Sequence, residues 1–158
     1  MSSTFCATYI SPIGPIKINC KDNKLISLQF TNHKERSKSN NFNNCAKKVI
    51  TQLDEYFLGK RKRFSLPFEL EGTTFEQKVW REILRLKFGE TISYKNLAIN
   101  INHPKAIRAV ANACGKNKLP LIIPCHRVVS SNSIGGYSAG ISKKKYLLNL
   151  ELVDIKSF

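Results

Sequence analysis

A cysteine and a histidine stand side by side in the segment Pro124-Cys125-His126-Arg127-Val128-Val129, directly after an apolar run at residues 119–124. A thiolate is a soft, strong nucleophile, and an imidazole can accept the proton of the thiol. The apolar run would exclude water from the surroundings of the sulfur. The positive charge of Arg127 also favours the thiolate. Adjacent side chains of an extended segment point in opposite directions, so we expect a bridging water to relay the proton. This local chemistry fits an acyl-transfer enzyme and a redox sensor equally well.

A base of this kind works best when a third group orients it. Glu151 is the candidate, because it lies on a predicted last helix that Ser142 can cap and that carries Leu147, Leu148 and Leu150. A lone glutamate late in a helix is normally solvated, and a free intracellular cysteine is usually an inert small hydrophobe. Spacing alone therefore leaves both the catalytic and the structural interpretation open.

The first part of the chain predicts a small antiparallel sheet with one helix. Residues 3–31 alternate apolar and polar side chains in short runs that turn residues separate. A polar loop is expected at residues 33–44, followed by a helix at residues 45–58 that Gly59 ends. A short extended piece is expected at residues 64–68.

A second group of elements begins after Gly72. Thr73 or Thr74 can cap a first helix. Ser93 can cap a short second helix, and Pro104 suits the first position of a third. Two short helices joined by a tight turn resemble a helix-turn-helix. We therefore expect the chain to divide near residue 72.

The helix expected from Pro104 has two different sides. One side is basic, amide-bearing or very small: Pro104, Lys105, Arg108, Ala111 and Asn112. The other side is apolar and is expected to be buried: Ala106, Ile107, Ala109, Val110, Ala113 and Cys114. Small residues let a backbone approach closely, and Arg108 between them can reach a phosphate or enter a groove. The alternative is an ordinary surface helix with two cations.

Positive charge dominates the 158-residue chain, with Lys+Arg 26, Asp+Glu 11 and a formal net charge of +15. The excess is present in both halves and includes the cluster Lys60-Arg61-Lys62-Arg63. It favours a polyanionic partner, nucleic acid before an anionic membrane, although a solvated lysine-rich surface explains the charge alone equally well. We expect no secretory signal and no membrane span, hence an intracellular, cytoplasmic protein with reduced cysteines.

No metal and no other cofactor is predicted. Four side chains of the first half are possible zinc ligands: Cys6, Cys20, His33 and Cys45. They include no close pair at the spacing that metal sites use.

Six blocks in a fixed order across residues 74–151 resemble the O6-alkylguanine-DNA alkyltransferases. They are Phe88-Gly89-Glu90-Thr91-Ile92-Ser93-Tyr94, Pro104-Lys105-Ala106-Ile107-Arg108-Ala109-Val110, Gly115-Lys116-Asn117, Ile123-Pro124-Cys125-His126-Arg127-Val128-Val129, Gly136-Tyr137-Ser138-Ala139-Gly140 and Leu147-Leu148-Asn149-Leu150-Glu151. The first third of the chain is similar chiefly at Ser11-Pro12-Ile13-Gly14. The resemblance implies an α/β (α+β) protein. A ribonuclease H-like domain would occupy residues 1–72, and a mainly helical domain with a winged helix-turn-helix residues 73–158.

The resemblance also implies a DNA repair protein that flips an O6-alkylated guanine out of the duplex and moves the alkyl group to its own cysteine. O4-alkylthymine is a second lesion of the same kind. Cys125 would be the nucleophile, His126 the base acting through water, and Glu151 the group that orients His126. Asn117 would brace the active-site turn. Because a thioether is a poor leaving group, Cys125 would be spent after one transfer.

Substrate-holding residues follow from the same resemblance. Tyr94 would give a hydrogen bond to the flipped base, so that guanine leaves neutral, and Arg108 would fill the gap in the stack. The other pocket residues would be Cys114, Val128, Tyr137 and Ser138. The DNA-binding residues would be Ser93, Lys105, Ala106, Arg108, Ala111 and Asn112. The partner is then double-stranded DNA carrying alkylated guanine, bound by a monomer.

Two other classes of protein stay open. A non-enzymatic relative that senses alkylated DNA would lack the nucleophile, and Cys125 argues against it. A helix-turn-helix regulator would need no thiol pocket and would usually be a dimer. Its binding to a specific duplex sequence would survive Cys125→Ala. Ala111 and Ile107 add bulk where many alkyltransferases carry smaller residues, and Cys114 could alter which alkyl groups fit.

Overall fold

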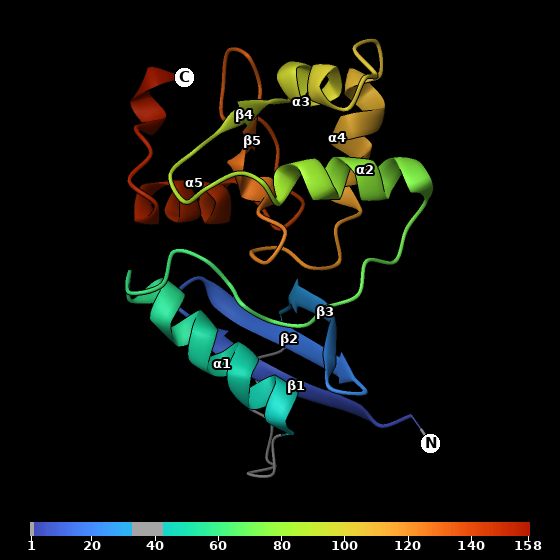
Figure 1. The fold of residues 1–158 in the computed structure, drawn as a ribbon. Helices are drawn as coiled ribbons and strands as arrows, with labels where there is room; N and C mark the ends of the chain where they lie inside the picture. Colours follow the sequence, from blue (N-terminus) through green and yellow to red (C-terminus); the bar gives the residue numbers. More distant parts are fainter. Residues whose placement is uncertain (1, 33–42) are drawn as a thin grey trace. The chain divides into compact units, whose positions relative to one another are not determined.

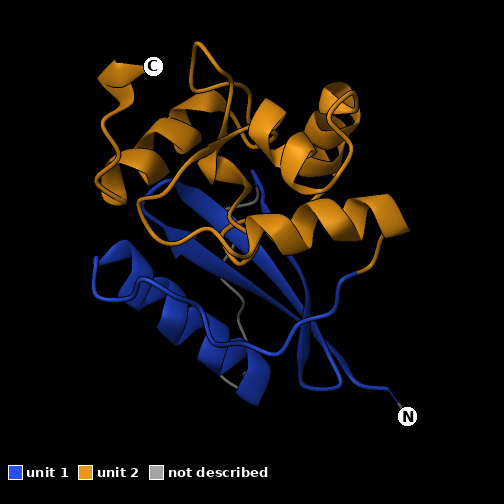
Figure 2. Ribbon diagram, turned by 45° about the horizontal axis from the view of Figure 1, so that its top comes forward, with its two compact units in different colours: residues 1–70 blue, residues 71–158 orange. Residues whose placement is uncertain are grey.

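The computed structural model describes residues 2–32 and 43–158 and separates into two compact units, residues 1–70 and 71–158 (Figure 2). The first unit holds β1, β2, β3 and α1. The second holds α2, β4, α3, α4, β5 and α5 with two 3₁₀ turns (Figure 1). The predicted mixed α/β architecture is confirmed. Most of the loop predicted at residues 33–44 lies outside the described residues.

Unit 1, residues 1–70, is built on a three-stranded antiparallel sheet. β1 (Thr4–Ser11), β2 (Gly14–Lys21) and β3 (Lys24–Phe30) pair in the order β1-β2-β3 through tight turns. Ile16 and Ile18 on β2 are fully buried, because alternate side chains of a strand share one face. The predicted antiparallel sheet is confirmed.

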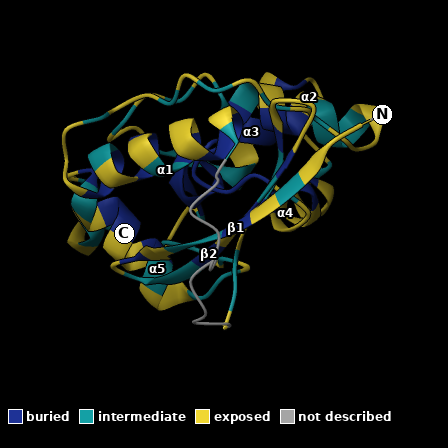
Figure 3. Cartoon of the chain, turned by 90° about the horizontal axis from the view of Figure 1, so that it is seen from below, coloured by how far each residue is buried: buried dark blue, intermediate teal, exposed yellow. Residues whose placement is uncertain are grey.

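Helix α1 (Asn44–Phe57) packs on this sheet. Its start is capped by Asn43, whose side-chain oxygen accepts a hydrogen bond from the Ala46 amide at 2.8 Å. It ends before Gly59, whose φ of +72° suits a residue without a Cβ atom. Buried and exposed residues fall on different faces of α1 (Figure 3), as in any amphipathic helix. The predicted helix and its glycine stop are confirmed.

Unit 2, residues 71–158, opens with α2 (Thr74–Ile83) and a capping box. The Thr73 hydroxyl accepts a hydrogen bond from the Glu76 amide at 3.2 Å. The Glu76 carboxylate in turn accepts one from the Thr73 amide at 3.0 Å. Of the two predicted capping residues, Thr73 is therefore the one that caps the helix.

Two short helices form the predicted helix-turn-helix. α3 (Tyr94–Asn100) is capped by the Ser93 hydroxyl, as predicted. α4 (Ile107–Gly115) begins three residues after Pro104, so the prediction that Pro104 opens this helix is wrong. The reason is a separate turn before the helix, in which the Ala106 amide is already hydrogen-bonded.

The buried side of α4 is narrower than predicted. Its buried residues are Val110, Ala113 and Cys114. The indole N–H of Trp80 on α2 donates to the Ala113 carbonyl at 2.9 Å, which fixes this side. Ile107 and Ala109 are exposed, contrary to prediction. A helix packed against two neighbours buries only a stripe of residues spaced i, i+3, i+4. The prediction instead assigned half of the helix circumference to the buried side.

A two-stranded parallel ladder positions the candidate nucleophile. β4 (Ile92–Ser93) pairs with β5 (Val128–Val129). The 3₁₀ turn Cys125–Arg127 immediately precedes β5. Because β4 leads directly into α3, the ladder fixes Cys125 relative to the helix-turn-helix.

The last helix, α5 (Ile141–Leu150), packs against that 3₁₀ turn. Its N-cap is Gly140, with a φ of +110°. The prediction that Ser142 caps α5 is wrong, because Ser142 lies inside the first helical turn. A second 3₁₀ turn, Ile155–Ser157, follows. In the part of the chain that the structure describes, no helix is long and apolar enough to cross a membrane.

Candidate active site

The chain doubles back tightly just before Cys125. Leu121 has a φ of +73°, and the Cys125 amide donates to the Ile123 carbonyl at 2.7 Å. The side-chain nitrogen of Asn117 donates to the same carbonyl at 2.8 Å and to Cys125 Sγ at 3.3 Å. The Asn117 oxygen accepts a hydrogen bond from the Leu119 amide at 2.9 Å. Asn117 therefore holds both the turn and the sulfur, and the apolar run around them is buried.

Burial opposes ionisation of this thiol. Cys125 is only 5% exposed. Burial raises the pKa of Cys125 above its ordinary value, while the hydrogen bond from Asn117 and the charge of Lys144 act in the opposite direction. Burial thus opposes the reactive thiolate that the sequence suggests, and the neutral thiol is the form that burial favours. The proton must leave as the reaction proceeds.

Lys144 on α5 brings positive charge to the site and was not among the predicted residues. Its side chain is fully buried, and Nζ donates to the carbonyls of Val128 at 2.6 Å and Gly136 at 2.8 Å. Nζ lies 5.9 Å from the centre of the Tyr94 ring. Burial lowers the pKa of Lys144 to about 8, although the nearby thiols, when ionised, raise it.

The sequence contains a signal for Lys144, but its neighbours conceal it. Lys143, Lys144 and Lys145 together look like a solvated helix face. Lys144 nevertheless stands three and four residues before Leu147 and Leu148, which are buried. That spacing places Lys144 on the buried side of the helix, where a lysine is rare unless it has partners.

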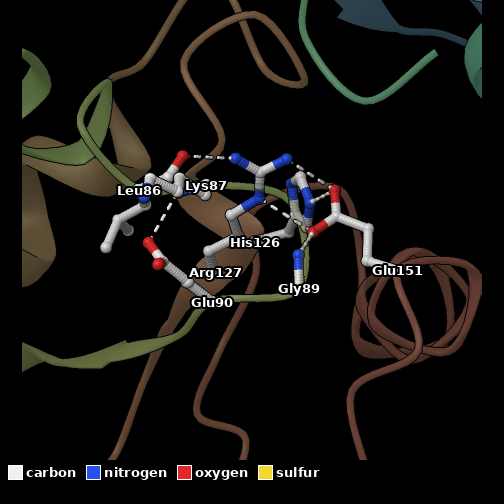
Figure 4. A network of polar contacts seen from close by, with 7 residues as sticks. All are labelled: Leu86, Lys87, Gly89, Glu90, His126, Arg127 and Glu151. Carbon is white, nitrogen blue, oxygen red and sulfur yellow. Dashed lines mark hydrogen bonds and ion pairs between the residues drawn. The ribbon is translucent and has the colours of Figure 1, made fainter.

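His126, Arg127 and Glu151 form a buried network of polar contacts (Figure 4). His126 Nε2 lies 2.8 Å from Glu151 Oε1. Arg127 donates to both oxygens of that carboxylate, from Nε at 2.8 Å and from Nη2 at 2.9 Å. Arg127 Nη1 donates to the Leu86 carbonyl at 2.7 Å, and the Gly89 amide donates to Glu151 Oε2 at 3.3 Å. The network ties the end of α5 to the segment between α2 and β4.

These contacts set the protonation of Glu151 and His126. Burial of Glu151 opposes ionisation, but the hydrogen bonds from His126 and Arg127 prevail and hold the pKa of Glu151 well below its usual range. Burial lowers the pKa of His126, although Glu151 acts in the opposite direction. Because an ionised carboxylate only accepts, Nε2 of a neutral His126 carries the hydrogen and Nδ1 is left as the proton acceptor.

The second ring nitrogen of His126, Nδ1, is the one that could accept the proton of Cys125. His126 Nδ1 is buried and has no hydrogen-bond partner among residues 2–32 and 43–158.

Arg127 was predicted to favour a thiolate at Cys125, and that prediction is wrong. Its guanidinium is bound by the Glu151 carboxylate and the Leu86 carbonyl.

A pocket of about 660 Å³ opens over the sulfur. With Cys125, its lining includes six predicted residues: Tyr94, Arg108, Ala111, Cys114, Tyr137 and Ser138. Ile107 and Ser130 also line it and were not predicted to do so. The Tyr94 hydroxyl donates to the Gly136 carbonyl at 3.4 Å, and burial raises the pKa of Tyr94 to about 12. A phenol held in its protonated form can donate a hydrogen bond to a bound base.

Other predicted residues lie outside this lining. The Val128 carbonyl is bound by Lys144, and the Ser93 hydroxyl caps α3. Lys105 and Asn112 are exposed and Ala106 is half-buried, and beside them Arg108, which lines the pocket, is also exposed. They form a solvent-facing surface at and before α4.

The five cysteines are free thiols. Cys20 and Cys45 are buried, whereas Cys6 is exposed. Within residues 2–32 and 43–158, no three His, Cys, Asp or Glu side chains gather as a metal site would require. His33 lies outside the described residues.

Two family models together match most of the chain. The DNA-binding domain of 6-O-methylguanine DNA methyltransferase matches residues 74–153, and the ribonuclease-like domain of the same family matches residues 4–70. The chain belongs to the 6-O-methylguanine DNA methyltransferase family. This assignment confirms the resemblance inferred from the six sequence blocks.

Similar methyltransferases come from distant sources. A probable methylated-DNA–protein-cysteine methyltransferase of Acanthamoeba polyphaga mimivirus is 44% identical over 142 residues, which are 88% of this chain and 91% of that protein. A methylated-DNA–protein-cysteine methyltransferase of Metallosphaera sedula is 41% identical over 91% of this chain and 90% of its own. The crystal structure of Mycobacterium tuberculosis OGT in complex with DNA matches with a TM-score of 0.82 at 36% identity, covering 91% of this chain and 90% of that one.

Proposed function

We propose that this methyltransferase repairs DNA by moving an alkyl group from O6 of guanine to Cys125. The observation that carries the proposal is the arrangement around this sulfur. Asn117 donates to it, the charge of Lys144 acts on it, and the pocket opens over it. His126 presents an unoccupied proton acceptor beside it in the sequence. A site of this composition suits displacement at carbon by a thiolate that forms during the reaction.

The transfer is balanced in atoms and charge. A water between Cys125 and His126 Nδ1 carries the thiol proton to the imidazole, and Glu151 stabilises the imidazolium. Sγ forms a bond to the alkyl carbon, the bond from that carbon to O6 breaks, and its electron pair passes to the guanine ring. Tyr94 donates a proton to the ring, so that neutral guanine leaves. The proton lost by Cys125 then restores Tyr94, and the product on the protein is a thioether.

The thioether makes the protein a reagent used once. A thioether sulfur is a poor leaving group, so the alkyl group stays on Cys125. O4-alkylthymine carries the same reactive carbon, so the chemistry extends to it. The protein acts as a monomer, because a single chain supplies every group in the scheme.

Access to the pocket requires the damaged base to leave the stack. Arg108 stands on the exposed side of α4 and also lines the pocket, so it can enter the gap that the base leaves. Ser93, Lys105, Ala106, Ala111 and Asn112 contact the duplex around that gap. We assign lesion binding and alkyl transfer to residues 73–158 and the ribonuclease-like domain to residues 1–72.

The direct test compares the two pocket cysteines. Wild type, Cys125→Ser and Cys114→Ser are incubated with duplex DNA whose O6-methylguanine carries a radiolabelled methyl group. We expect label on wild type and Cys114→Ser and none on Cys125→Ser, which should still bind the duplex. Label on Cys125→Ser, or none on wild type, would overturn the proposal.

Base flipping has its own test. Arg108→Ala should slow transfer from duplex DNA far more than transfer from the free modified base, because the free base has no stack to leave. Equal losses on both substrates would remove Arg108 from this role.

A further inference from the structure

A second strongly basic feature belongs to unit 1, whereas the helix-turn-helix and the cysteine pocket belong to unit 2. We call Lys60-Arg61-Lys62-Arg63, which directly follows α1, the basic turn. Lys60, Lys62 and Arg63 are exposed. Nothing in the alkyl-transfer scheme uses these four cations.

The backbone of the basic turn is anchored to α1 at both ends. The amides of Lys60 and Arg61 donate to the Glu55 carbonyl at 2.8 and 3.1 Å. Beyond the turn, the Gln52 side chain donates to the Ser65 carbonyl at 3.0 Å and accepts from the Ser65 amide at 2.8 Å. A segment held in this way presents its side chains without a large loss of backbone entropy when a ligand binds.

Within the turn, one cation is internal and the others face solvent. Arg61 pairs with the Glu55 carboxylate, and its Nη1 donates to the Arg63 carbonyl at 2.9 Å. Across residues 2–32 and 43–158, neither Lys60 nor Arg63 forms an ion pair. Arg61 and Arg63 also line an open recess of about 710 Å³ together with residues 64–67. Arg61 thus orders the turn, and Lys60 and Arg63 stay available to an anion.

We propose that the basic turn binds backbone phosphates of DNA and gives the protein a second DNA contact, in unit 1. This inference rests on the proposed function, which makes DNA the polyanion that this chain meets. A second contact on one chain raises the local concentration of DNA at the first, so a few weak phosphate contacts strengthen binding. Stabilisation of the C-terminus of α1 by nearby cations is the structural alternative.

The test removes the outward charges and keeps Arg61. Lys60→Gln/Lys62→Gln/Arg63→Gln is compared with Lys17→Gln/Lys21→Gln/Lys47→Gln, which loses the same charge from exposed positions of unit 1. Binding to undamaged duplex is followed by fluorescence anisotropy over a range of salt concentrations. Each lost phosphate contact makes the slope of log K against log salt shallower by about 0.9. We expect the slope to become shallower by about two in the first variant only.

Equal slopes for the two triple variants would overturn the inference. So would binding of the basic turn to phosphatidylserine vesicles with an unchanged DNA slope, since the partner would then be a membrane. A urea melt of both variants checks α1. A loss of stability confined to the first variant, with no change in slope, would assign the cations to the helix end.

The outcome is separable from that of the proposed function. The first triple variant should accept an alkyl group from the free modified base at the wild-type rate. If wild type accepts no alkyl group at all, the proposed function fails. The salt slopes still report on the basic turn in that case.

Discussion

Two buried cations near Cys125, Arg127 and Lys144, are held in different ways. Arg127 donates to both oxygens of the Glu151 carboxylate and to a backbone carbonyl. Lys144 is bound by two neutral carbonyls, those of Val128 and Gly136. In the described part of the chain it has no carboxylate partner.

The difference shows which charge is available to the chemistry. A cation neutralised by a carboxylate organises its surroundings, whereas a cation held by dipoles keeps a charge that acts on its neighbours. The charge of Lys144 lowers the pKa of Cys125 against the effect of burial. Arg127 instead helps to keep Glu151 ionised and joins it to the segment before β4. We therefore expect Arg127 to act as a positioning residue and Lys144 to support the thiolate electrostatically.

The largest effect expected from breaking this arrangement is structural. Arg127→Met leaves the Glu151 carboxylate buried without its main partner, and removing one member of a buried ion pair typically costs about 3–5 kcal/mol. Urea denaturation should show a loss of unfolding free energy of that size, whereas Lys145→Met on the exposed side of α5 should show almost none. A loss no greater than in the control would contradict the structural role.

Acid should weaken the same network. The pKa of Glu151 is lower in the folded protein than its ordinary value of 4.5, so the stability it contributes is present above that pH and is lost as the pH falls below it. The difference in unfolding free energy between wild type and Glu151→Gln should therefore shrink below pH 4.5. A difference independent of pH would mean that the ionised carboxylate is not what stabilises the fold.

Lys144→Met should have the opposite effect to Arg127→Met: the reaction should slow, whereas the fold should persist. Because Lys144 is held by neutral carbonyls, its exchange for an apolar side chain of similar length leaves no unpaired charge behind, so the loss of stability should be smaller than for Arg127→Met and the fold should persist. The thiol pKa should rise without the charge, and the thiolate population falls about tenfold for each unit of rise. Methyl transfer and alkylation by iodoacetamide at pH 7 should therefore both slow. Unchanged rates, with Lys145→Met as the control, would remove Lys144 from the reaction.

The smallest expected effect is a change in folding stability at alkaline pH that depends on Lys144. Its pKa is about 8 in the folded protein and 10.5 ordinarily, so the unfolded chain binds more protons between these values. The stability of wild type relative to Lys144→Met should therefore rise as the pH increases through this interval. A relative stability that falls there would mean that the buried ammonium stabilises the fold.

Local patterns made the elements predictable. The Thr73 capping box, the Ser93 cap and the Gly59 stop depend on side chains within a few residues, and the structure has all three. The start of α4 was less accessible to prediction, because a turn that involves Ala106 competes with the helix.

The site was only partly predictable for a different reason. Cys125 and His126 are adjacent, so their combined chemistry could be predicted from the sequence. The charge available to Cys125 depends on Glu151 binding Arg127 across 24 residues, which no local pattern reveals. Lys144 stands between two other lysines, so the three resemble a solvated helix face. Only its spacing from the buried leucines distinguishes it from its neighbours.

The central claim is that Cys125 accepts one alkyl group and is then spent. Intact-protein mass spectrometry during incubation with excess duplex DNA containing O6-methylguanine tests it most directly. The protein should gain the mass of one methyl group and then stop, and peptide mapping should find that methyl group on Cys125. A mass that does not change, a gain that passes one methyl group per chain, or a methyl group on Cys114 instead would contradict the account.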